Sequence, residues 1–385
     1  MGRSPSAAVS VERQLADRIL AQVDEGRRLD VAWEALGAGR SPARSWLRHL
    51  IYGTVRLRGR LDHVLGRFLR RPLASLDGPV LRVLRQGAFQ VLYMDSVPDY
   101  AAVSESVALV RRSDSASAAG LVNAVLRKVA AVDDLPGLFP GEDDLPAFLT
   151  TWGSHPEWLV DRWLQAFGEE ETRALVEANN TEPHVYLHPV GLSEAEARVR
   201  LAAAGIESVA EGGLLRLDRE TDPAAALRLV PAVVQDPAAA WVTRFAAPPD
   251  NGLVADVCAA PGGKALVLSR GFGARRPVLA GDRSAVRLRR VVRAAARLEA
   301  PVWPVVMDAR QPPLRRADLV LVDAPCSGTG TLRRHPDARW RVQPDDVATL
   351  SSLQEAILEG CAPLVPPDGL LVYATCTLED EENVS

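Results

Sequence analysis

The sequence has few cysteines and no long apolar segment, and both absences narrow the class of protein. Its four cysteines are Cys258, Cys326, Cys361 and Cys376; they include no close pair and lack the nearby histidines of a zinc site. We expect free thiols in a reducing compartment and no bound metal. No run of about 18 apolar residues is present, and the first residues lack the apolar core of a secretory signal. These absences predict a cytoplasmic protein without a membrane span.

Positive charge is concentrated near the N-terminus, although the net charge of the 385 residues is −4. The first 130 residues contain 20 Arg and Lys against 12 Asp and Glu. A local excess of this kind favours contact with nucleic acid. The length of the chain predicts two or three domains.

Three segments with different periodicity predict three domains. Residues 11–132 carry apolar side chains three or four positions apart, which predicts an all-α domain, and a Pro/Gly/Asp-rich linker follows at 133–146. Residues 150–248 mix short helices and strands, which indicates a small α/β module of ferredoxin-like or similar fold. In residues 249–385, the apolar runs LVADV, VLAGD, VWPVVMD, ADLVLVD and GLLVYAT alternate with helices. Buried runs in this pattern predict a parallel, doubly wound Rossmann-like sheet that binds ligands beyond the carboxyl ends of its strands.

A small-residue loop follows the first of these runs. It consists of Cys258, Ala259, Ala260, Pro261, Gly262, Gly263 and Lys264. Small residues let a backbone approach a ligand closely, and the pattern is neither GxGxxG nor GxxxxGK[ST], which argues against a dinucleotide or a triphosphate. An ordinary glycine-rich turn is the alternative.

Two acidic residues end the next two runs. Asp282 stands where a carboxylate can accept hydrogen bonds from both ribose hydroxyls, and Asp308 where one could meet an adenine edge. With the loop, they describe an adenosine-shaped pocket that suits S-adenosylmethionine better than NAD. Strand-end aspartates also occur as plain helix caps, which is the alternative for each acid.

Two cysteines follow the last two strands in polar loops. Asp323-Ala-Pro-Cys326-Ser-Gly-Thr-Gly330 ends the fourth run, and Tyr373-Ala-Thr-Cys376-Thr ends the fifth, before the acidic residues 379–382 and Asn383. These strands should be neighbours, so both thiols are expected to open into one pocket. Their polar surroundings favour reactive roles, whereas Cys361 lies in an apolar run that is typical of a structural cysteine.

Thiols suit methylation of a pyrimidine carbon. A thiolate that adds to C6 of cytosine makes C5 nucleophilic enough to attack a methyl group. Asp323 could hydrogen-bond N3 and the exocyclic amine, and a base must then remove the C5 proton before the thiolate leaves. A thiol with the reference pKa of about 8.5 needs nearby positive charge, and Lys264 is a candidate for it.

The loops together resemble a known family. CAAPGGK, DAPCSGTG and YATCT followed by EEN are similar to the motifs of the two-cysteine RNA cytosine-5 methyltransferases. The resemblance implies that Cys376 is the nucleophile and that Cys326 assists product release. It also implies that Cys258 to Lys264, Asp282, Asp308 and Asp323 contact S-adenosylmethionine.

The resemblance extends upstream. YGTVRLRGRLD, RQGAFQVLYMDSVPDYAAVSESV and GLVNAVLRKV resemble the NusB-like domain fused to bacterial 16S rRNA cytosine-5 methyltransferases of the Sun/Fmu type, and HPEWLVDRW and VQDPAAAWV resemble their connecting segments. The implied substrate is one cytosine of 16S rRNA, which must be unstacked for the thiol to reach C6. We expect a monomer, with no membrane partner.

Two departures from that type stand out. Leu187-His188-Pro189-Val190 replaces an Arg-Val-Asn-like strand, so an RNA contact from that Arg and Asn is not expected. The sequence also stops at Ser385, before the helix and antiparallel hairpin that usually complete such a sheet. We therefore expect a C-terminally truncated methyltransferase domain with an exposed sheet edge.

Three alternative functions remain open. The enzyme could act on tRNA or another rRNA, which the NusB-like start argues against. It could be a non-catalytic RNA-binding protein built on a degenerate methyltransferase, which the presence of both cysteines disfavours. A DNA cytosine methyltransferase would be expected to carry its nucleophile in the Pro-Cys loop alone.

Overall fold

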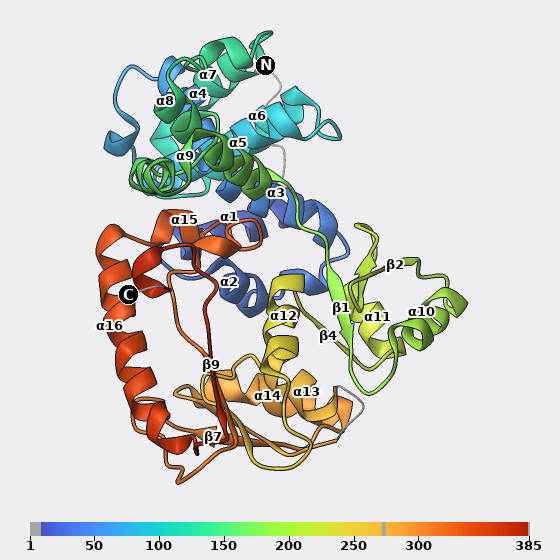
Figure 1. Cartoon of the computed structure of the whole chain (residues 1–385). Coiled ribbons are helices and arrows are strands. Elements are labelled where there is room, and N and C mark those ends of the chain that lie inside the picture. Colours follow the sequence, from blue (N-terminus) through green and yellow to red (C-terminus); the bar gives the residue numbers. More distant parts are fainter. Residues whose placement is uncertain (1–8, 272–274, 384–385) are drawn as a thin grey trace. The chain divides into compact units, whose positions relative to one another are not determined.

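A computed structural model describes residues 9–271 and 275–383 (Figure 1). They form two compact units. The helical unit runs to Glu182 and also includes the segment Thr331–Gln343; the α/β unit comprises residues 183–330 and the chain from Pro344 onward. None of the helices in these described ranges combines the length and apolar character that crossing a membrane requires.

The helical unit contains only helices and their connections among its described residues. Its α-helices are α1 (Val11–Asp24), α2 (Leu29–Ala35), α3 (Arg44–Arg56), α4 (Arg58–Phe68), α5 (Gly78–Tyr93), α6 (Asp99–Arg111), α7 (Ala119–Ala130), α8 (Leu145–Thr151), α9 (Glu157–Asn180) and α15 (Ala338–Arg341). The predicted all-α architecture is confirmed, including the helices expected at 80–93 and 121–129.

Apolar spacing on α3 explains its burial. Leu50 and Ile51 lie three and four positions after Leu47, and all three are fully buried, as a helix with one face toward the core requires. Gly53 on the same helix permits a close approach to α5, because a Cβ there would lie 2.0 Å from Phe89 Cζ. A glycine is therefore needed where these two helices pack together.

The segment Thr331–Gln343 belongs to the helical unit although it follows the Cys326 loop in sequence. Its Arg339 is only 1% exposed and donates hydrogen bonds to Ser154 O at 2.9 Å, Asn180 Oδ1 at 3.0 Å and Arg56 O at 3.2 Å. Burial and the charge of Arg56 lower the pKa of Arg339 to about 9. All three acceptors are neutral oxygens. They come from three separate segments of the chain, so the buried guanidinium of Arg339 holds these segments together.

The first sheet of the α/β unit is antiparallel. Its elements are β1 (Tyr186–Pro189), α10 (Glu194–Ala203), β2 (Ser208–Glu211), β3 (Leu214–Leu217), α11 (Pro223–Leu229) and β4 (Ala232–Val234), followed by α12 (Pro237–Ala246). The strand order is β2-β3-β1-β4. Ser193 and Glu196 form a capping box that starts α10. This βαββαβ arrangement is the ferredoxin-like fold that the sequence predicted.

The second sheet is parallel. It is built from β5 (Val254–Asp256), α13 (Gly263–Arg270), β6 (Val278–Asp282), α14 (Ala285–Leu298), β7 (Val302–Val306), β8 (Leu319–Asp323), α16 (Pro344–Cys361) and β9 (Leu370–Ala374). Its strand order, β7-β6-β5-β8-β9, reverses direction at β5, as in doubly wound folds. The predicted Rossmann-like sheet is confirmed.

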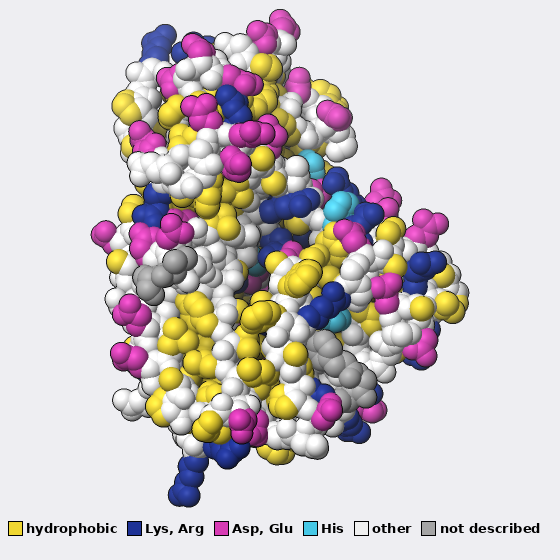
Figure 2. All heavy atoms as spheres, viewed as in Figure 1, with side chains coloured by type: hydrophobic (Ala, Val, Ile, Leu, Met, Phe, Trp, Pro, Cys, Tyr) yellow, Lys and Arg dark blue, Asp and Glu magenta, His cyan; other side chains and the backbone are white. Residues whose placement is uncertain are grey.

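The outer strands differ from the fully buried runs that the sequence predicted. Trp303 and Val306 of β7 are 54% and 60% exposed, and Leu370 of β9 is 48% exposed. An edge strand has a neighbour on one side only, and Pro304 within β7 suits an edge because it lacks an N–H donor. Hydrophobic side chains gather on the surface drawn in Figure 2, in the part where Figure 1 places β9.

The buried Arg339 generates a stability prediction. Arg339→Met should lower the free energy of unfolding by about 3 kcal/mol, because several buried oxygens lose their donor at ~1–3 kcal/mol each. Thermal unfolding followed by circular dichroism should show a Tm lower by about 5–10 °C. Arg341→Met is the matched control, since that side chain is 41% exposed. Equal Tm values for the two variants would contradict the structural role of Arg339.

Candidate active site

Adjacent parallel strands bring the two cysteine loops together. Asp323, the last residue of β8, is paired in register with Ala374, the last residue of β9. Both following loops therefore start from the same edge of the sheet, and the expected neighbouring of these strands is confirmed. Cys326 Sγ lies 3.3 Å from Cys376 Sγ, and both are free thiols.

Backbone and hydroxyl hydrogen bonds join the two loops. Gly330 N donates to Cys376 O at 3.0 Å, and Leu378 N donates to Thr329 Oγ1 at 2.9 Å. The hydroxyls of Ser327 and Thr377 are 2.7 Å apart and buried. The relative position of the two thiols is thus set by a network of short side chains around them.

Glu382 supports the Cys326 loop; on sequence alone it was part of the acidic run and the EEN motif but had no predicted role of its own. Its buried carboxylate accepts hydrogen bonds from Ser327 N and from Gln354 Nε2, each at 2.9 Å. Tyr373 Oη donates to the backbone carbonyl of Glu382 at 2.7 Å. The acidic run that follows Cys376 was the signal that could have pointed to this role. Since the Cys376 and Cys326 loops were expected to be neighbours, a carboxylate in one could accept hydrogen bonds from N–H groups of the other.

The two thiols have different environments. Cys376 is exposed, whereas Cys326 is partly buried. The hydrogen bond with Cys376, and then burial, raise the pKa of Cys326 far above its usual value, although Cys376 N donates to Cys326 Sγ at 3.3 Å. Cys326 is therefore a neutral thiol at physiological pH, able to donate its proton toward Cys376 Sγ.

The other two cysteines lie in apolar surroundings. Cys361 is fully buried, and burial raises its pKa to about 11. Burial and the charge of Asp256 raise the pKa of Cys258 to about 12. Both thiols therefore stay protonated at neutral pH. The buried, apolar surroundings of Cys361 are those expected of a structural cysteine.

The small-residue loop lies between β5 and α13. Gly262 has φ of 110°, and a Cβ there would lie 3.1 Å from Val291, so a side chain would be both strained and crowded. Gly263 opens α13, and a Cβ there would meet only Gln235 Nε2 at 3.8 Å. Ala259 N donates to Gly281 O at 2.8 Å, which holds the loop beside the end of β6.

Lys264 is paired with the acid of the Cys326 loop. Its Nζ lies 2.7 Å from Asp323 Oδ2. The sequence suggested that Lys264 supplies positive charge to a thiol; the contact that the structure shows joins it to Asp323. An ion pair therefore links the loop Cys258–Lys264 directly to the start of the Cys326 loop.

The strand-end acids Asp282 and Asp308 are held by arginines. Asp282 is buried, accepts from Ser284 N at 2.8 Å and lies 3.1 Å from Arg287 Nη1. Ser284, not Asp282, caps α14, which disfavours the helix-cap alternative for Asp282.

Asp308 forms a two-pronged pair with Arg310, with Nη2 to Oδ2 at 2.7 Å and Nε to Oδ1 at 3.1 Å. The hydrogen bonds from Arg310 lower the pKa of Asp308 to about 2. Arg287 lies five residues after Asp282, and Arg310 two residues after Asp308. The sequence did not predict these ion pairs, because either arginine side chain could equally point to solvent.

Asp256 is a fourth strand-end acid that sequence reasoning missed. It ends β5, is only 1% exposed, and within residues 9–271 and 275–383 neither carboxylate oxygen has a hydrogen bond of good geometry. Burial and the charge of Asp323 raise its pKa to about 8, against weaker opposing effects of Lys264 and the Cys258 N–H group. The signal was present in LVADV, where Asp256 stands next to the end of an apolar run, much as Asp282 and Asp323 end theirs.

Family models match the chain in three places. The NusB family matches residues 10–131, the ferredoxin-like domain of RsmF/B-like methyltransferases matches 155–221, and the 16S rRNA methyltransferase RsmB/F family matches 244–385. The matches follow the order of the helical, antiparallel and parallel parts described above.

Known proteins resemble most of the chain. A probable ribosomal RNA small subunit methyltransferase B from Synechocystis sp. is 34% identical over 361 residues, which cover 89% of this chain and 79% of that protein. Ribosomal RNA small subunit methyltransferase B from Pasteurella multocida is 34% identical over 364 residues, 88% of this chain and 76% of that protein.

The crystal structure of PH0851 has the same fold, with a TM-score of 0.78 and 23% identity, covering 100% of this chain and 88% of that one. Fold, domain order and curated relatives agree: the chain belongs to the RsmB/F family of 16S rRNA methyltransferases.

Proposed function

We propose that this chain methylates C5 of a single cytosine in 16S rRNA, acting as a monomer in the cytoplasm. The observation that carries the proposal is the pair of thiols 3.3 Å apart at the ends of adjacent parallel strands. The names of the relatives support an rRNA substrate. We assign RNA holding to residues 11–132, connection to 150–248 and catalysis to 249–385.

We further propose S-adenosylmethionine as the cofactor, which supplies the methyl group when bound. The residues present suit it. Gly262 and Gly263 leave the backbone of the loop Cys258–Lys264 open to a close ligand, and Asp282 offers carboxylate oxygens for ribose hydroxyls. Asp256, at the end of β5 and two residues before this loop, has a buried carboxyl group whose oxygens lack a well-formed hydrogen bond among the described residues. Asp308 completes the set at the end of the neighbouring strand.

Cys376 is the proposed nucleophile. It is the exposed member of the pair, and the thiol of Cys326 can stabilise a thiolate on Cys376 by donating a hydrogen bond to it. The Cys376 sulfur would bond to C6 of cytosine, which makes C5 nucleophilic. Asp323, the last residue of β8 and oriented by its ion pair with Lys264, would accept a hydrogen bond from the exocyclic amine of the base.

Cys326 is proposed to assist release. The largest cause of its raised pKa is its hydrogen bond with Cys376. Once Cys376 is bonded to carbon, its sulfur is a thioether with neither charge nor proton, so the pKa of Cys326 falls. Cys326 can then lose its proton to water and accept the proton from C5, while the bond between the Cys376 sulfur and C6 breaks.

The two thiols have distinguishable predicted phenotypes. With 16S rRNA and labelled S-adenosylmethionine, Cys376→Ala should lower methyl transfer at least ~10³-fold, because the covalent step is lost. Cys326→Ala should instead accumulate a protein–RNA adduct that survives denaturing electrophoresis.

Cys361→Ser is the matched control for the thiol variants, since it removes a thiol from a buried position outside the two loops. It should keep near-normal activity per folded molecule. Unchanged methyl transfer in Cys376→Ala, or clean turnover by Cys326→Ala, would contradict the assigned roles.

The buried Asp256 predicts a pH dependence of stability. The unfolded chain releases this proton near pH 3.8, whereas the folded chain keeps it to about pH 8. The free energy of unfolding therefore falls as the pH rises through this window. Asp256→Asn removes that contribution, so the wild type should lose about 1–3 kcal/mol more stability than the variant between pH 5 and pH 8. Urea unfolding of both proteins at the two pH values measures the difference; parallel pH profiles would refute the buried, protonated carboxyl.

A further inference from the structure

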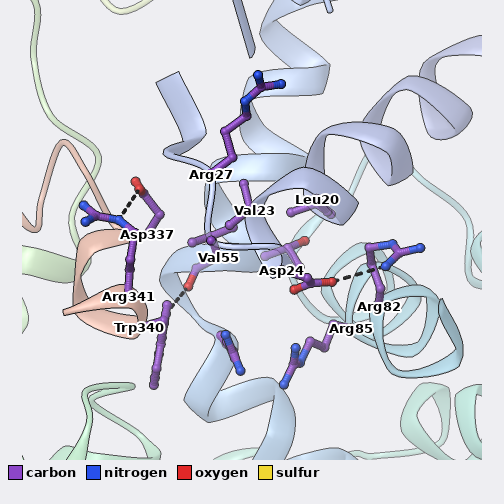
Figure 3. A pocket seen from close by; sticks show the side chains of 13 residues that line it. Leu20, Val23, Asp24, Arg27, Val55, Arg82, Arg85, Asp337, Trp340 and Arg341 are labelled. Carbon is purple, nitrogen blue, oxygen red and sulfur yellow. Dashed lines mark hydrogen bonds and ion pairs between the residues drawn. The ribbon is translucent and has the colours of Figure 1, made fainter. Parts of the chain in front are cut away.

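The helical unit contains a cavity that the proposed chemistry does not use. It measures about 420 Å³ and is lined by residues of α1, α3, α4, α5 and the segment Thr331–Gln343 (Figure 3). All of these parts belong to one compact unit. The volume falls in the range of ~300–1,000 Å³ that is usual for small-ligand sites.

The cavity is rich in positive charge. Five of its lining residues are arginines (Arg27, Arg58, Arg82, Arg85 and Arg341), and two are aspartates, Asp24 and Asp337. Two of these arginines are fully engaged within the protein. Arg82 Nε lies 2.7 Å from Asp17 Oδ1, and Arg85 makes two bonds to Asp62, at 2.7 and 2.8 Å.

Arg58 lacks a close carboxylate of its own. Its Nε lies 3.9 Å from Asp62 Oδ2, an oxygen that already accepts a bond from Arg85 Nη2. Burial and the adjacent charge of Arg85 lower the pKa of Arg58, while Asp62 and Asp24 act in the opposite sense. The guanidinium thus has N–H donors to offer, in a place where a further anion would be stabilised.

The rim adds another weakly engaged arginine. Arg27 is exposed and donates to the neutral Gln22 Oε1 at 2.8 Å. A phosphate bound at Arg58 would therefore find a second positive charge at the edge of the same cavity.

The remaining wall is apolar and aromatic. Leu20, Val23 and Val55 contribute aliphatic surface, and Trp340 is held in place because its Nε1 donates to Val55 O at 2.7 Å. Arg58 Cζ lies 5.3 Å from the centre of the Trp340 ring. An indole beside a guanidinium is a combination that binds a base and its phosphate together.

Thr54 provides an independent indication of a ligand. It lines the cavity, is only 3% exposed, and its hydroxyl has no hydrogen-bond partner in the described part of the chain. Leaving a buried hydroxyl unbonded costs ~1–3 kcal/mol, which a polar ligand group would recover.

We propose that this cavity binds one unpaired nucleotide of the RNA substrate, with its phosphate on Arg58 and its base against Val55 and Trp340. The proposal rests on the proposed function for the identity of the RNA. An acidic peptide would satisfy the arginines but leave the apolar and aromatic wall without a matching group. A nucleotide carries both chemistries. None of the residues that line the cavity belongs to the loops of Cys326 and Cys376, so the site would hold a base other than the target.

The test uses the full chain without S-adenosylmethionine and a fluorescently labelled single-stranded fragment of 16S rRNA. Arg58→Gln should raise the Kd about 5–20-fold and reduce the slope of log K against log salt by ~0.7, the value for one phosphate contact in a single strand. Arg27→Gln, at the exposed rim, should give a smaller effect in the same direction and has little reason to misfold.

Arg67→Gln is the matched control, because Arg67 is exposed in the last turn of the same helix, α4, and does not line the cavity. It should change Kd less than twofold. An oligoribonucleotide containing 4-thiouridine should also crosslink to the peptide that carries Trp340, and Arg58→Gln should suppress that crosslink.

The outcomes separate the two proposals. If Arg58→Gln and Arg27→Gln both bind RNA like Arg67→Gln, and no crosslink reaches Trp340, the nucleotide site is refuted even if the enzyme methylates rRNA. If a polyglutamate peptide binds in an Arg58-dependent way and RNA does not, the cavity takes an acidic protein segment instead. If RNA binds as expected but wild-type protein transfers no methyl group, the proposed function fails and the nucleotide site stands.

Discussion

Parallel pairing of β8 with β9 is the constraint on which the candidate site depends. Parallel strands present their carboxyl ends at one edge, so Asp323 and Ala374 finish side by side and the loops after them leave the sheet together. Without that register, two cysteines 50 residues apart in sequence would have no reason to meet at 3.3 Å. The strand order also places β5 next to β8, which brings the small-residue loop and Lys264 to Asp323.

Short polar side chains fix the two cysteine loops that leave the sheet edge. Hydroxyls of Ser327, Thr329 and Thr377 bond to one another across the two loops. Thr329 and Glu382 also accept hydrogen bonds from backbone N–H groups of the loops. Buried hydrogen bonds of this kind tolerate little displacement, because each unsatisfied group costs free energy. The loops are therefore held in one arrangement while Cys376 itself stays exposed, which suits the nucleophilic role that we propose for it.

The segment Thr331–Gln343 follows the Cys326 loop in sequence and belongs to the helical unit. Gly330 donates to Cys376 O, and the next residues, Thr331–Gln343, pack with the helices through Arg339 and Trp340. Trp340 also forms part of the arginine-rich cavity. A nucleotide held there would contact Trp340, in a segment that begins immediately after the Cys326 loop in sequence.

The sequence by itself determined the elements and the motifs. Apolar periodicity located the helices of the helical unit, runs ending in Asp located the strands, and the loops around Cys326 and Cys376 were recognisable because their residues are consecutive. Only the tertiary structure decided which side chains meet: Lys264 with Asp323, Glu382 with Ser327, Arg339 with Ser154 and Asn180. It also decided that Trp303 and Val306 of β7 are exposed and that Asp256 is buried. The physical reason is that periodicity and motifs are local properties of the chain, whereas burial, ion pairing and pKa shifts depend on partners far away in sequence.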